Sequence, residues 1–239
     1  MLLNGVRQCG KTYVLKEFGR REFDSLAYVS CDRNVNLQAI YSGDFDVARI
    51  IQGLSALTGV DIIPDKTLIF LDEVQAFPQA LEALKYFCED APEYHIAVAG
   101  SLLGVALHAG VSFPVGKVQT LRLFPMDFEE FLMAMGEEQL LKLMHSHDYE
   151  LMNAFHEKLK DLLRQYYYVG GMPEVVKAFV ENKLLNQVRS LQNEILSNYA
   201  SDFSKHAPSQ EVPRIDMVWQ SILGQLSKEN KKFVYGVLK

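Results

Sequence analysis

Residues 5–12 read Gly5-Val6-Arg7-Gln8-Cys9-Gly10-Lys11-Thr12, which matches the pattern G-x-x-x-x-G-K-[ST]. The match lies between a short apolar segment, residues 1–4, and a helical pattern that begins at Lys11, so it has the strand–loop–helix context that the pattern requires. In such a loop the backbone N–H groups converge on phosphate oxygens, and the N-terminus of the following helix adds a partial positive charge. The stretch therefore predicts a phosphate-binding loop in a parallel α/β sheet.

The side chains of this loop have separate expected roles. We expect Lys11, as an exposed loop lysine, to neutralise the β- and γ-phosphate oxygens of a nucleoside triphosphate. The hydroxyl of Thr12 is expected to ligate Mg²⁺. The predicted nucleotide-binding residues of the loop are Gly5, Val6, Arg7, Gln8, Cys9, Gly10, Lys11, Thr12 and Tyr13.

A second candidate half of the site follows the apolar run at residues 67–71, which leads directly into Asp72 and Glu73. A buried strand that ends in two carboxylates places them at the carboxyl edge of the sheet, beside the phosphate loop. We expect Asp72 to hold Mg²⁺ through water, and Glu73 to orient and deprotonate the attacking water. The two side chains are expected to point to opposite sides of the strand end. The alternative is a helix cap or a surface acid pair, and the position of the pair downstream of a phosphate loop favours the site.

Ser101 follows another short apolar run, at residues 96–99. A polar side chain at the tip of a neighbouring strand is placed to sense a γ-phosphate or to position water. An N-cap for a helix over residues 102–109 accounts for Ser101 equally well. The sequence leaves both interpretations open.

The chain divides into a mixed first half and a helical second half. Short β-branched runs alternate with helical patterns up to Pro125, which predicts a parallel sheet flanked by helices. The predicted strands are residues 1–4, 26–30, 67–71, 96–99 and 118–123, and the predicted helices between them are residues 11–18, 45–58 and 78–90. After Pro125, Asp127 is expected to cap a helix, and helical periodicity continues over residues 150–168 and 174–204.

Breaks at residues 170–173 and 207–208 complete this division. We therefore predict an α/β domain at residues 1–125, an all-helical domain at 126–206, and a third segment at 207–239. The fold class is a parallel-sheet P-loop NTPase domain followed by the all-helical domain.

Composition is that of an ordinary globular protein. The chain has 239 residues, of which 49% are hydrophobic and 23% charged, and this excludes a disordered or fibrous chain. The net charge of −6 is divided evenly between residues 1–125 and 126–239, so it indicates neither a nucleic acid nor an anionic membrane as partner. Three cysteines without C-x-x-C spacing suit a reducing cytoplasm, and no apolar stretch reaches the length of a membrane span. We expect a cytoplasmic protein without a membrane partner.

The phosphate loop at residues 5–12, the pair Asp72 and Glu73, and Ser101 together resemble the AAA+-type ATPases of the ASCE division of P-loop proteins. The resemblance implies an AAA+-like fold in which the all-helical domain, residues 126–206, is a lid. Further stretches resemble an uncharacterised bacterial and archaeal ATPase family that is related to the signal-transducing, STAND-like NTPases. The stretches that carry this second resemblance are residues 100–105 (GSLLGV), 112–117 (SFPVGK), 123–131 (LFPMDFEEF), 170–176 (GGMPEVV) and 201–206 (SDFSKH). Members of this family carry a helical lid, a winged-helix segment and usually a C-terminal nuclease-like domain. By this resemblance the chain is a fragment of a longer protein at both ends, and residues 207–239 begin the winged helix.

The resemblance also implies roles for particular residues. It identifies ATP as the nucleotide, with Pro173 packed against adenine and Gly171 allowing close approach. In such ATPases an arginine after the fourth strand acts on the γ-phosphate bound by a neighbouring copy. Lys117 and Arg122 are the candidates here, although neither fills the familiar position clearly. The predicted catalytic residues are Glu73, Lys11, Ser101 and Arg122, and the predicted metal ligands are Thr12 and Asp72.

The expected function is ATP binding and Mg²⁺-dependent hydrolysis coupled to movement of the lid. The alternative is a switch that hydrolyses ATP slowly and controls a DNA- or protein-binding C-terminal module. The expected partners are ATP, a DNA or protein partner of the missing C-terminal region, and other copies of the chain in a homo-oligomer.

Overall fold

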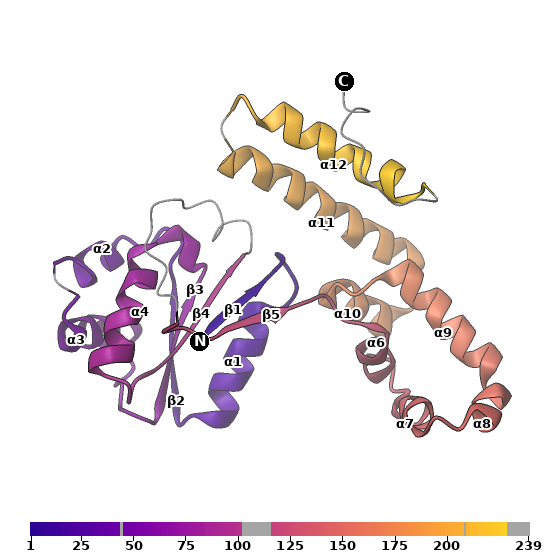
Figure 1. Ribbon diagram of the computed structural model, residues 1–239, viewed down its shortest axis with the longest axis horizontal. Coiled ribbons are helices and arrows are strands. Elements are labelled where there is room, and N and C mark those ends of the chain that lie inside the picture. Colours follow the sequence, from indigo (N-terminus) through magenta and orange to yellow (C-terminus); the bar gives the residue numbers. More distant parts are fainter. Residues whose placement is uncertain (44, 102–115, 208, 229–239) are drawn as a thin grey trace.

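The computed structural model describes residues 1–43, 45–101, 116–207 and 209–228. A five-stranded sheet, in which every neighbouring pair is parallel, occupies the first part (Figure 1). Its strand order is β2-β3-β4-β1-β5. The strands are β1 (Leu2–Gly5), β2 (Ser25–Ser30), β3 (Thr67–Asp72), β4 (His95–Ser101) and β5 (Thr120–Leu123). All of the predicted strands are present, with ends that differ by no more than two residues.

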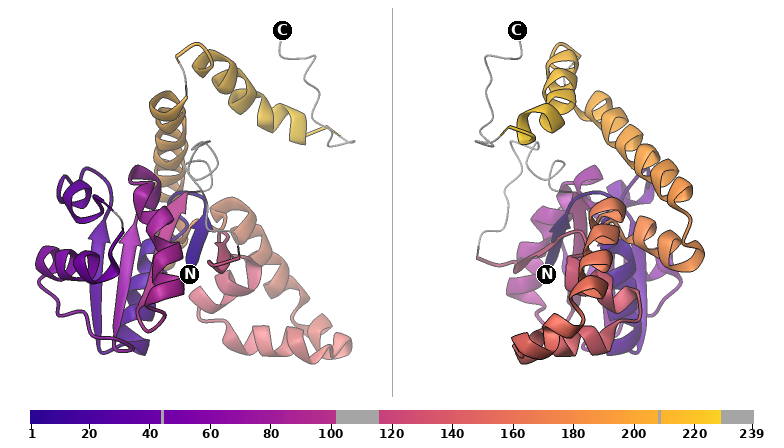
Figure 2. Two further views of the ribbon diagram at one scale, coloured as in Figure 1. Left: turned by 60° about the vertical axis from the view of Figure 1, so that its left-hand side comes forward. Right: turned by 90° about the vertical axis from the view of Figure 1, so that its right-hand side faces the viewer.

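Helices cover both faces of this sheet, which makes three layers (Figures 1 and 2). Successive strand residues point to opposite faces, so Leu2, Leu71 and Val98 contribute to the larger core on one face. Leu3 and Phe70 pack with Leu15 of α1 on the other face. The covering helices are α1 (Lys11–Glu22) on the second face, and α2 (Asn36–Ile40), α3 (Val47–Thr58) and α4 (Gln79–Asp90) on the first. Burial on both faces explains why the strands are apolar runs without polar alternation.

The strand order determines which loops can meet. Strand β4 lies between β1, which leads into the phosphate loop, and β3, which ends at Asp72. The register pairs Gly5 with Ser101, so the end of β4 lies beside the start of the loop. The carboxyl ends of β1, β3 and β4 therefore form one edge, which is where parallel α/β sheets bind their ligands.

The second part of the chain is helical. Its elements are α6 (Phe128–Ala134), α7 (Glu138–Ser146), α8 (Tyr149–Ala154), α9 (His156–Val169), α10 (Pro173–Asn182), α11 (Leu185–His206) and α12 (Val212–Leu226). The predicted cap at Asp127 is present as a full capping box, in which its carboxylate accepts the Glu130 N–H and the Glu130 carboxylate accepts the Asp127 N–H. The break before Pro173 is also present, since α9 ends at Val169 and Pro173 begins α10.

Two predicted helices are each divided in the structure. The helix predicted at residues 150–168 is α8 followed by α9, with a junction at Phe155. The helix predicted at 174–204 is α10 followed by α11, because Lys183 adopts a left-handed conformation with φ 56° and ends α10. A lysine in this conformation gives no glycine-like signal in the sequence, so periodicity alone does not reveal the break.

The helical part has its own core and a close backbone contact between Gly171 and Met126. Phe131, Val175 and Phe179 are central to a buried cluster drawn from α6, α9, α10 and α11. The backbone of Gly171 lies directly on that of Met126, whose N–H donates to the Gly171 carbonyl at 2.7 Å. A Cβ atom on Gly171 would overlap the Met126 carbonyl. In this structure the close approach that Gly171 permits is to the backbone of Met126.

No helix among the described residues is both long and apolar enough to cross a membrane. The helix predicted at residues 102–109 and most of the stretch 112–117 lie outside the described residues.

Candidate active site

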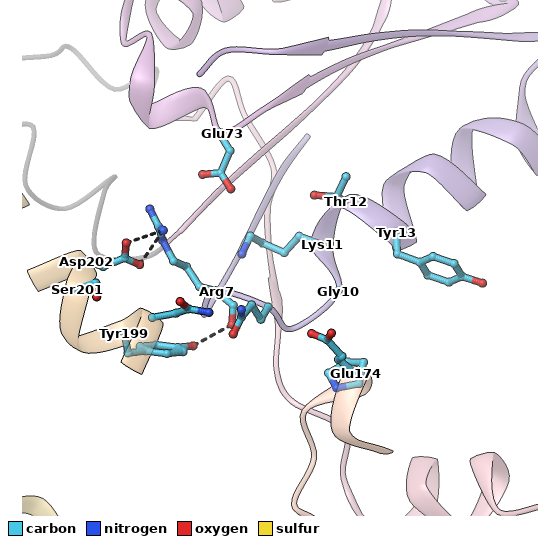
Figure 3. A pocket seen from close by; sticks show the side chains of 13 residues that line it. Arg7, Gly10, Lys11, Thr12, Tyr13, Glu73, Glu174, Tyr199, Ser201 and Asp202 are labelled. Carbon is cyan, nitrogen blue, oxygen red and sulfur yellow. Dashed lines mark hydrogen bonds and ion pairs between the residues drawn. The ribbon is translucent and has the colours of Figure 1, made fainter. Parts of the chain in front are cut away.

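A cavity of about 570 Å³ lies where the phosphate loop faces α10 and α11 (Figure 3). This volume lies within the range of small-molecule sites. The cavity is lined by Arg7, Gln8, Gly10, Lys11, Thr12, Tyr13, Glu73, Pro173, Glu174, Asn198, Tyr199, Ser201 and Asp202. It therefore joins residues of the loop and the end of β3 with residues of α10 and α11 that lie at least 100 positions further along the chain.

The phosphate loop is shaped by its own backbone and by Lys11. Gly10 has φ 95°, a left-handed conformation that favours glycine, and it leads directly into α1 without a side-chain cap. The first N–H groups of α1 therefore remain for a ligand. The Lys11 ammonium donates to the carbonyls of Gly5 at 3.1 Å and Val6 at 2.8 Å. Lys11 is only 8% exposed, so the expectation of an exposed loop lysine is wrong, because the loop curls around its side chain.

Thr12 and Asp72 meet at the end of β3. The Thr12 hydroxyl donates to Oδ2 of Asp72 at 2.7 Å, and the Tyr28 hydroxyl donates to the same oxygen at 3.3 Å. Burial, and after it the negative charge of Asp72, raises the pKa of Tyr28, which keeps this donor protonated. Asp72 itself is 5% exposed. One hydroxyl and one carboxylate fit Mg²⁺, which prefers oxygen ligands and completes its shell with water and substrate phosphates.

Glu73 leaves the strand in an unusual conformation. Its φ of 52° is left-handed, and the short 3₁₀ helix Val74–Ala76 follows it. The side chain lines the cavity (Figure 3), where one carboxylate oxygen accepts from the amide nitrogen of buried Gln75. Asp72 and Glu73 have different surroundings, since Glu73 lines the cavity and Asp72 does not. The left-handed residue interrupts the alternation of the strand, so Asp72 reaches Thr12 while Glu73 faces the same loop from the cavity.

Helix α11 contributes residues that sequence reasoning missed. The Arg7 guanidinium contacts both carboxylate oxygens of Asp202 at 2.7 Å (Figure 3). The Tyr199 hydroxyl donates to the Arg7 carbonyl at 2.8 Å. Burial raises the pKa of Tyr199, so this hydroxyl stays a donor. The only sequence signal was the resemblance carried by residues 201–206, together with the three-residue spacing that places Tyr199 and Asp202 on one helix face.

Helix α10 approaches the loop from another side. The Pro173 ring lies 3.7 Å from the position that a Cβ atom of Gly10 would take. Glu174, which was not predicted, lines the same cavity and adds a third carboxylate to those of Glu73 and Asp202. The first turn of α10 therefore packs on the glycine at the end of the phosphate loop.

Other predicted residues lie outside the cavity lining. Ser101 is buried at the end of β4, and the helix that it was expected to cap lies outside the described residues. Arg122 is exposed on β5, with its guanidinium 5.8 Å from the centre of the Phe124 ring. Lys117, the other candidate for the arginine position, forms an ion pair with Glu89 at 3.2 Å.

The remaining loop residues Gly5, Val6 and Cys9 also do not line the cavity. Val6 is exposed, whereas Cys9 is buried with its sulfur 3.9 Å from the Leu123 carbonyl oxygen. Gly5 and Val6 act within the loop by presenting the carbonyls that hold Lys11.

A parallel sheet whose first strand leads into this loop, and whose third strand ends in two carboxylates beside it, defines a P-loop nucleotide-binding protein. Residues 1–132, more than half of the chain, match the family of AAA domains, and the protein belongs to that family. The predicted fold class is confirmed. Residues 160–239 match a domain of unknown function, DUF8612.

The solved structures that are similar to the chain include two complexes with DNA. One is the Aeropyrum pernix ORC1 protein in complex with DNA, with 18% identity over 99% of this chain and 69% of that chain, and a TM-score of 0.36. The other is Drosophila ORC bound to DNA, with 14% identity over 100% of this chain and 78% of that chain, and a TM-score of 0.45. None of the curated proteins matches the chain.

Proposed function

We propose that the protein is a Mg²⁺-dependent ATPase. The observation that carries this proposal is the meeting of Lys11, Thr12, Asp72 and Glu73 at one sheet edge, beside a cavity large enough for a nucleotide. Lys11 and the loop N–H groups would bind the β- and γ-phosphates. Thr12 and Asp72 would hold Mg²⁺, which when bound neutralises phosphate charge.

Glu73 would accept the proton of the attacking water, because, of the two carboxylates at the end of β3, it is the one that lines the cavity. Gln75 holds one oxygen of that carboxylate and would thereby orient it. Pro173 and the first turn of α10 would contact the adenine end of ATP, as the family resemblance implies. The exposure of Arg122 supports an action on a neighbouring copy in a homo-oligomer, and not on its own site.

The second candidate function is a switch with slow hydrolysis, and the direct contacts between the loop and α11 favour it. In that case the bound nucleotide would set the position of the helical part, residues 126–206. The output would pass through α12 and the segment from residue 207 to a DNA or protein partner. Turnover of isolated protein near 1 s⁻¹ supports the first candidate, and tight binding with almost no turnover supports the second.

Substitution Asp72→Asn tests the metal half of the proposal. We expect it to weaken the Mg²⁺-dependent part of ATP affinity by about 10- to 100-fold, because a negatively charged oxygen is lost beside the Thr12 hydroxyl. ATP affinity would be measured by calorimetry with Mg²⁺ and with excess chelator. The control Asp161→Asn removes the same charge on exposed α9 and should leave both affinities unchanged. An unchanged ratio in Asp72→Asn would contradict the metal assignment.

Substitution Pro173→Ala tests the proposed adenine contact. We expect the affinity for ATP to fall by about 3- to 10-fold, from the apolar area lost at the base, while inorganic triphosphate binds as before. Competition of the two ligands against a fluorescent nucleotide would measure both. Pro213→Ala is the matched control, because Pro213 also lies in the first turn of a helix, α12, but does not line the cavity. Equal effects on both ligands would make Pro173 a structural residue only.

A further inference from the structure

The side chain of Arg7 is engaged by a carboxylate in a way that the proposed ATPase chemistry does not use. Arg7 belongs to the phosphate loop, yet its guanidinium points away from the loop toward α11 (Figure 3). There it forms a 2.7 Å ion pair with Asp202, whose side chain is 8% exposed while that of Arg7 is 36% exposed. The Asp202 carboxylate, which belongs to the helical part, is thus paired with a cation of the predicted phosphate-binding loop, the Arg7 guanidinium.

Helix α11 makes a second contact with the phosphate loop and also packs against α12, in both cases through Tyr199. The Tyr199 hydroxyl donates to the Arg7 carbonyl at 2.8 Å. The Tyr199 ring stacks on the Trp219 ring of α12, with centroids 6.0 Å apart and planes inclined by 7°. Arg7, Tyr199 and Trp219 therefore form one continuous path from the phosphate loop to the last described helix.

The charges in the cavity set up a competition for Arg7. Glu73, Glu174 and Asp202 line the cavity together with the cations Lys11 and Arg7. Lys11 is fixed by two loop carbonyls, so its position does not depend on α11. A guanidinium binds phosphate with the same planar geometry that it uses for a carboxylate. A terminal phosphate entering beside Arg7 therefore competes with Asp202 for the same donors.

The loss of Arg7 would leave Asp202 as a buried carboxylate close to added negative charge. Removing one partner of a buried ion pair costs much free energy, because the remaining charge is left unpaired, unless that charge reaches water. Rotation or withdrawal of α11 would expose Asp202, and this would separate Tyr199 from the loop. A nucleoside diphosphate whose last phosphate lies at Lys11 would leave the Arg7–Asp202 ion pair intact, because it lacks the terminal phosphate that would reach Arg7.

We propose that Arg7 and Asp202 are the residues that distinguish a nucleoside triphosphate from a diphosphate, with Arg7 exchanging the Asp202 carboxylate for the terminal phosphate. The exchange releases the Tyr199 face of α11 and changes the surroundings of Trp219. This inference rests on the proposed nucleotide function. It assigns the preference for triphosphate over diphosphate to Arg7 and Asp202, and it links that preference to the surroundings of Trp219.

The chain offers a built-in probe for this exchange, because Trp219 is its single tryptophan. We expect Mg-ATP to change the emission of Trp219 in the parent chain and Mg-ADP to leave it nearly unchanged. Calorimetry on the same samples would give the affinity for each nucleotide independently of the tryptophan signal.

Substitution Asp202→Asn removes the competing charge at nearly constant side-chain volume. We expect ATP affinity to rise by about 10-fold because the ion pair no longer has to be broken, with ADP affinity changing by less than about twofold. Arg7→Lys replaces the planar fork with a single ammonium, and we expect it to lower the preference for ATP over ADP by about 10-fold. Glu194→Gln is the matched control, since it removes one exposed negative charge from the same helix outside the cavity.

Tyr199→Phe provides a variant that removes only one hydroxyl. We expect it to keep the preference for ATP while reducing the response of Trp219, because the hydroxyl contact with the loop is lost. Far-ultraviolet circular dichroism would confirm that each variant is folded.

The possible results distinguish failure of the proposed function from failure of the Arg7–Asp202 exchange alone. Parent protein that binds neither nucleotide overturns the proposed function and this inference with it. Parent protein that binds both, with the same ATP-to-ADP ratio in Asp202→Asn and Arg7→Lys as in Glu194→Gln, overturns this inference alone. A Trp219 response that is equal for ATP and ADP also overturns it.

Discussion

Substitution Lys11→Ala is expected to reduce Mg-ATP affinity by at least about 100-fold. The ammonium group would make charge-assisted hydrogen bonds to two phosphate groups, each contributing about 1.5–3 kcal/mol. Among the described residues, no other cation is held by two carbonyls of the loop. Some loss of stability, about 1 kcal/mol, should accompany this effect because the carbonyls of Gly5 and Val6 lose their donor. Calorimetric titration and thermal unfolding of the same preparations measure both quantities.

The control for this substitution is Lys142→Ala, which removes an exposed lysine from α7. It should leave the affinity for ATP unchanged. If Lys11→Ala binds Mg-ATP as tightly as the parent chain, the assignment of residues 5–12 as a phosphate site is wrong. If it binds weakly but also unfolds at a much lower temperature, Lys11→Arg, which keeps a cation for the loop carbonyls, separates the two causes.

The sheet was predictable from the sequence because its signals are local. Apolar runs such as residues 67–71 are buried on both faces, so length and flanking polar residues were enough to place them. The phosphate loop was predictable for the same reason, because its two glycines and Lys11 lie within eight residues. The strand before it and the helix after it are also adjacent in the sequence. The capping box at Asp127 is also encoded within four residues.

The conformation of single residues was less predictable. Glu73 and Lys183 both adopt left-handed backbone angles without being glycine or asparagine. At Glu73 this turns the carboxylate toward the cavity, and at Lys183 it divides a long helical pattern into α10 and α11. Such angles persist only where surrounding structure determines them, so a single sequence contains no sign of them.

The contribution of α11 to the cavity depends on packing between distant parts of the chain. Arg7 and Asp202 are separated by 195 residues, and nothing in either local sequence specifies that they meet. The helical part reaches the loop because Gly171 packs on Met126 and the core around Phe131 sets the direction of α10 and α11. Each of these is a tertiary contact, and periodicity predicts only that the helices exist.

Substitution Glu73→Gln is expected to slow ATP hydrolysis by about 10²–10⁴-fold, which is the usual contribution of a positioned general base. The amide retains the size of the carboxylate, and its carbonyl oxygen can still accept from Gln75, so the local structure should persist. Affinity for Mg-ATP should stay equal or rise, because one negative charge facing the triphosphate is removed. Lower turnover with undiminished binding is a combination that general loss of structure would not produce.

Single-turnover hydrolysis, with enzyme in excess over radiolabelled ATP, measures the chemical step without product release. Glu181→Gln, which removes an exposed carboxylate from α10, is the control and should hydrolyse ATP at the parental rate. Comparison with Asp72→Asn then separates the two adjacent carboxylates. Asp72 contacts Thr12 and should affect metal-dependent binding, whereas Glu73 contacts Gln75 at the cavity and should affect the rate. Parental hydrolysis by Glu73→Gln would mean that another group takes the proton from water, and that Glu73 only shapes the turn after β3.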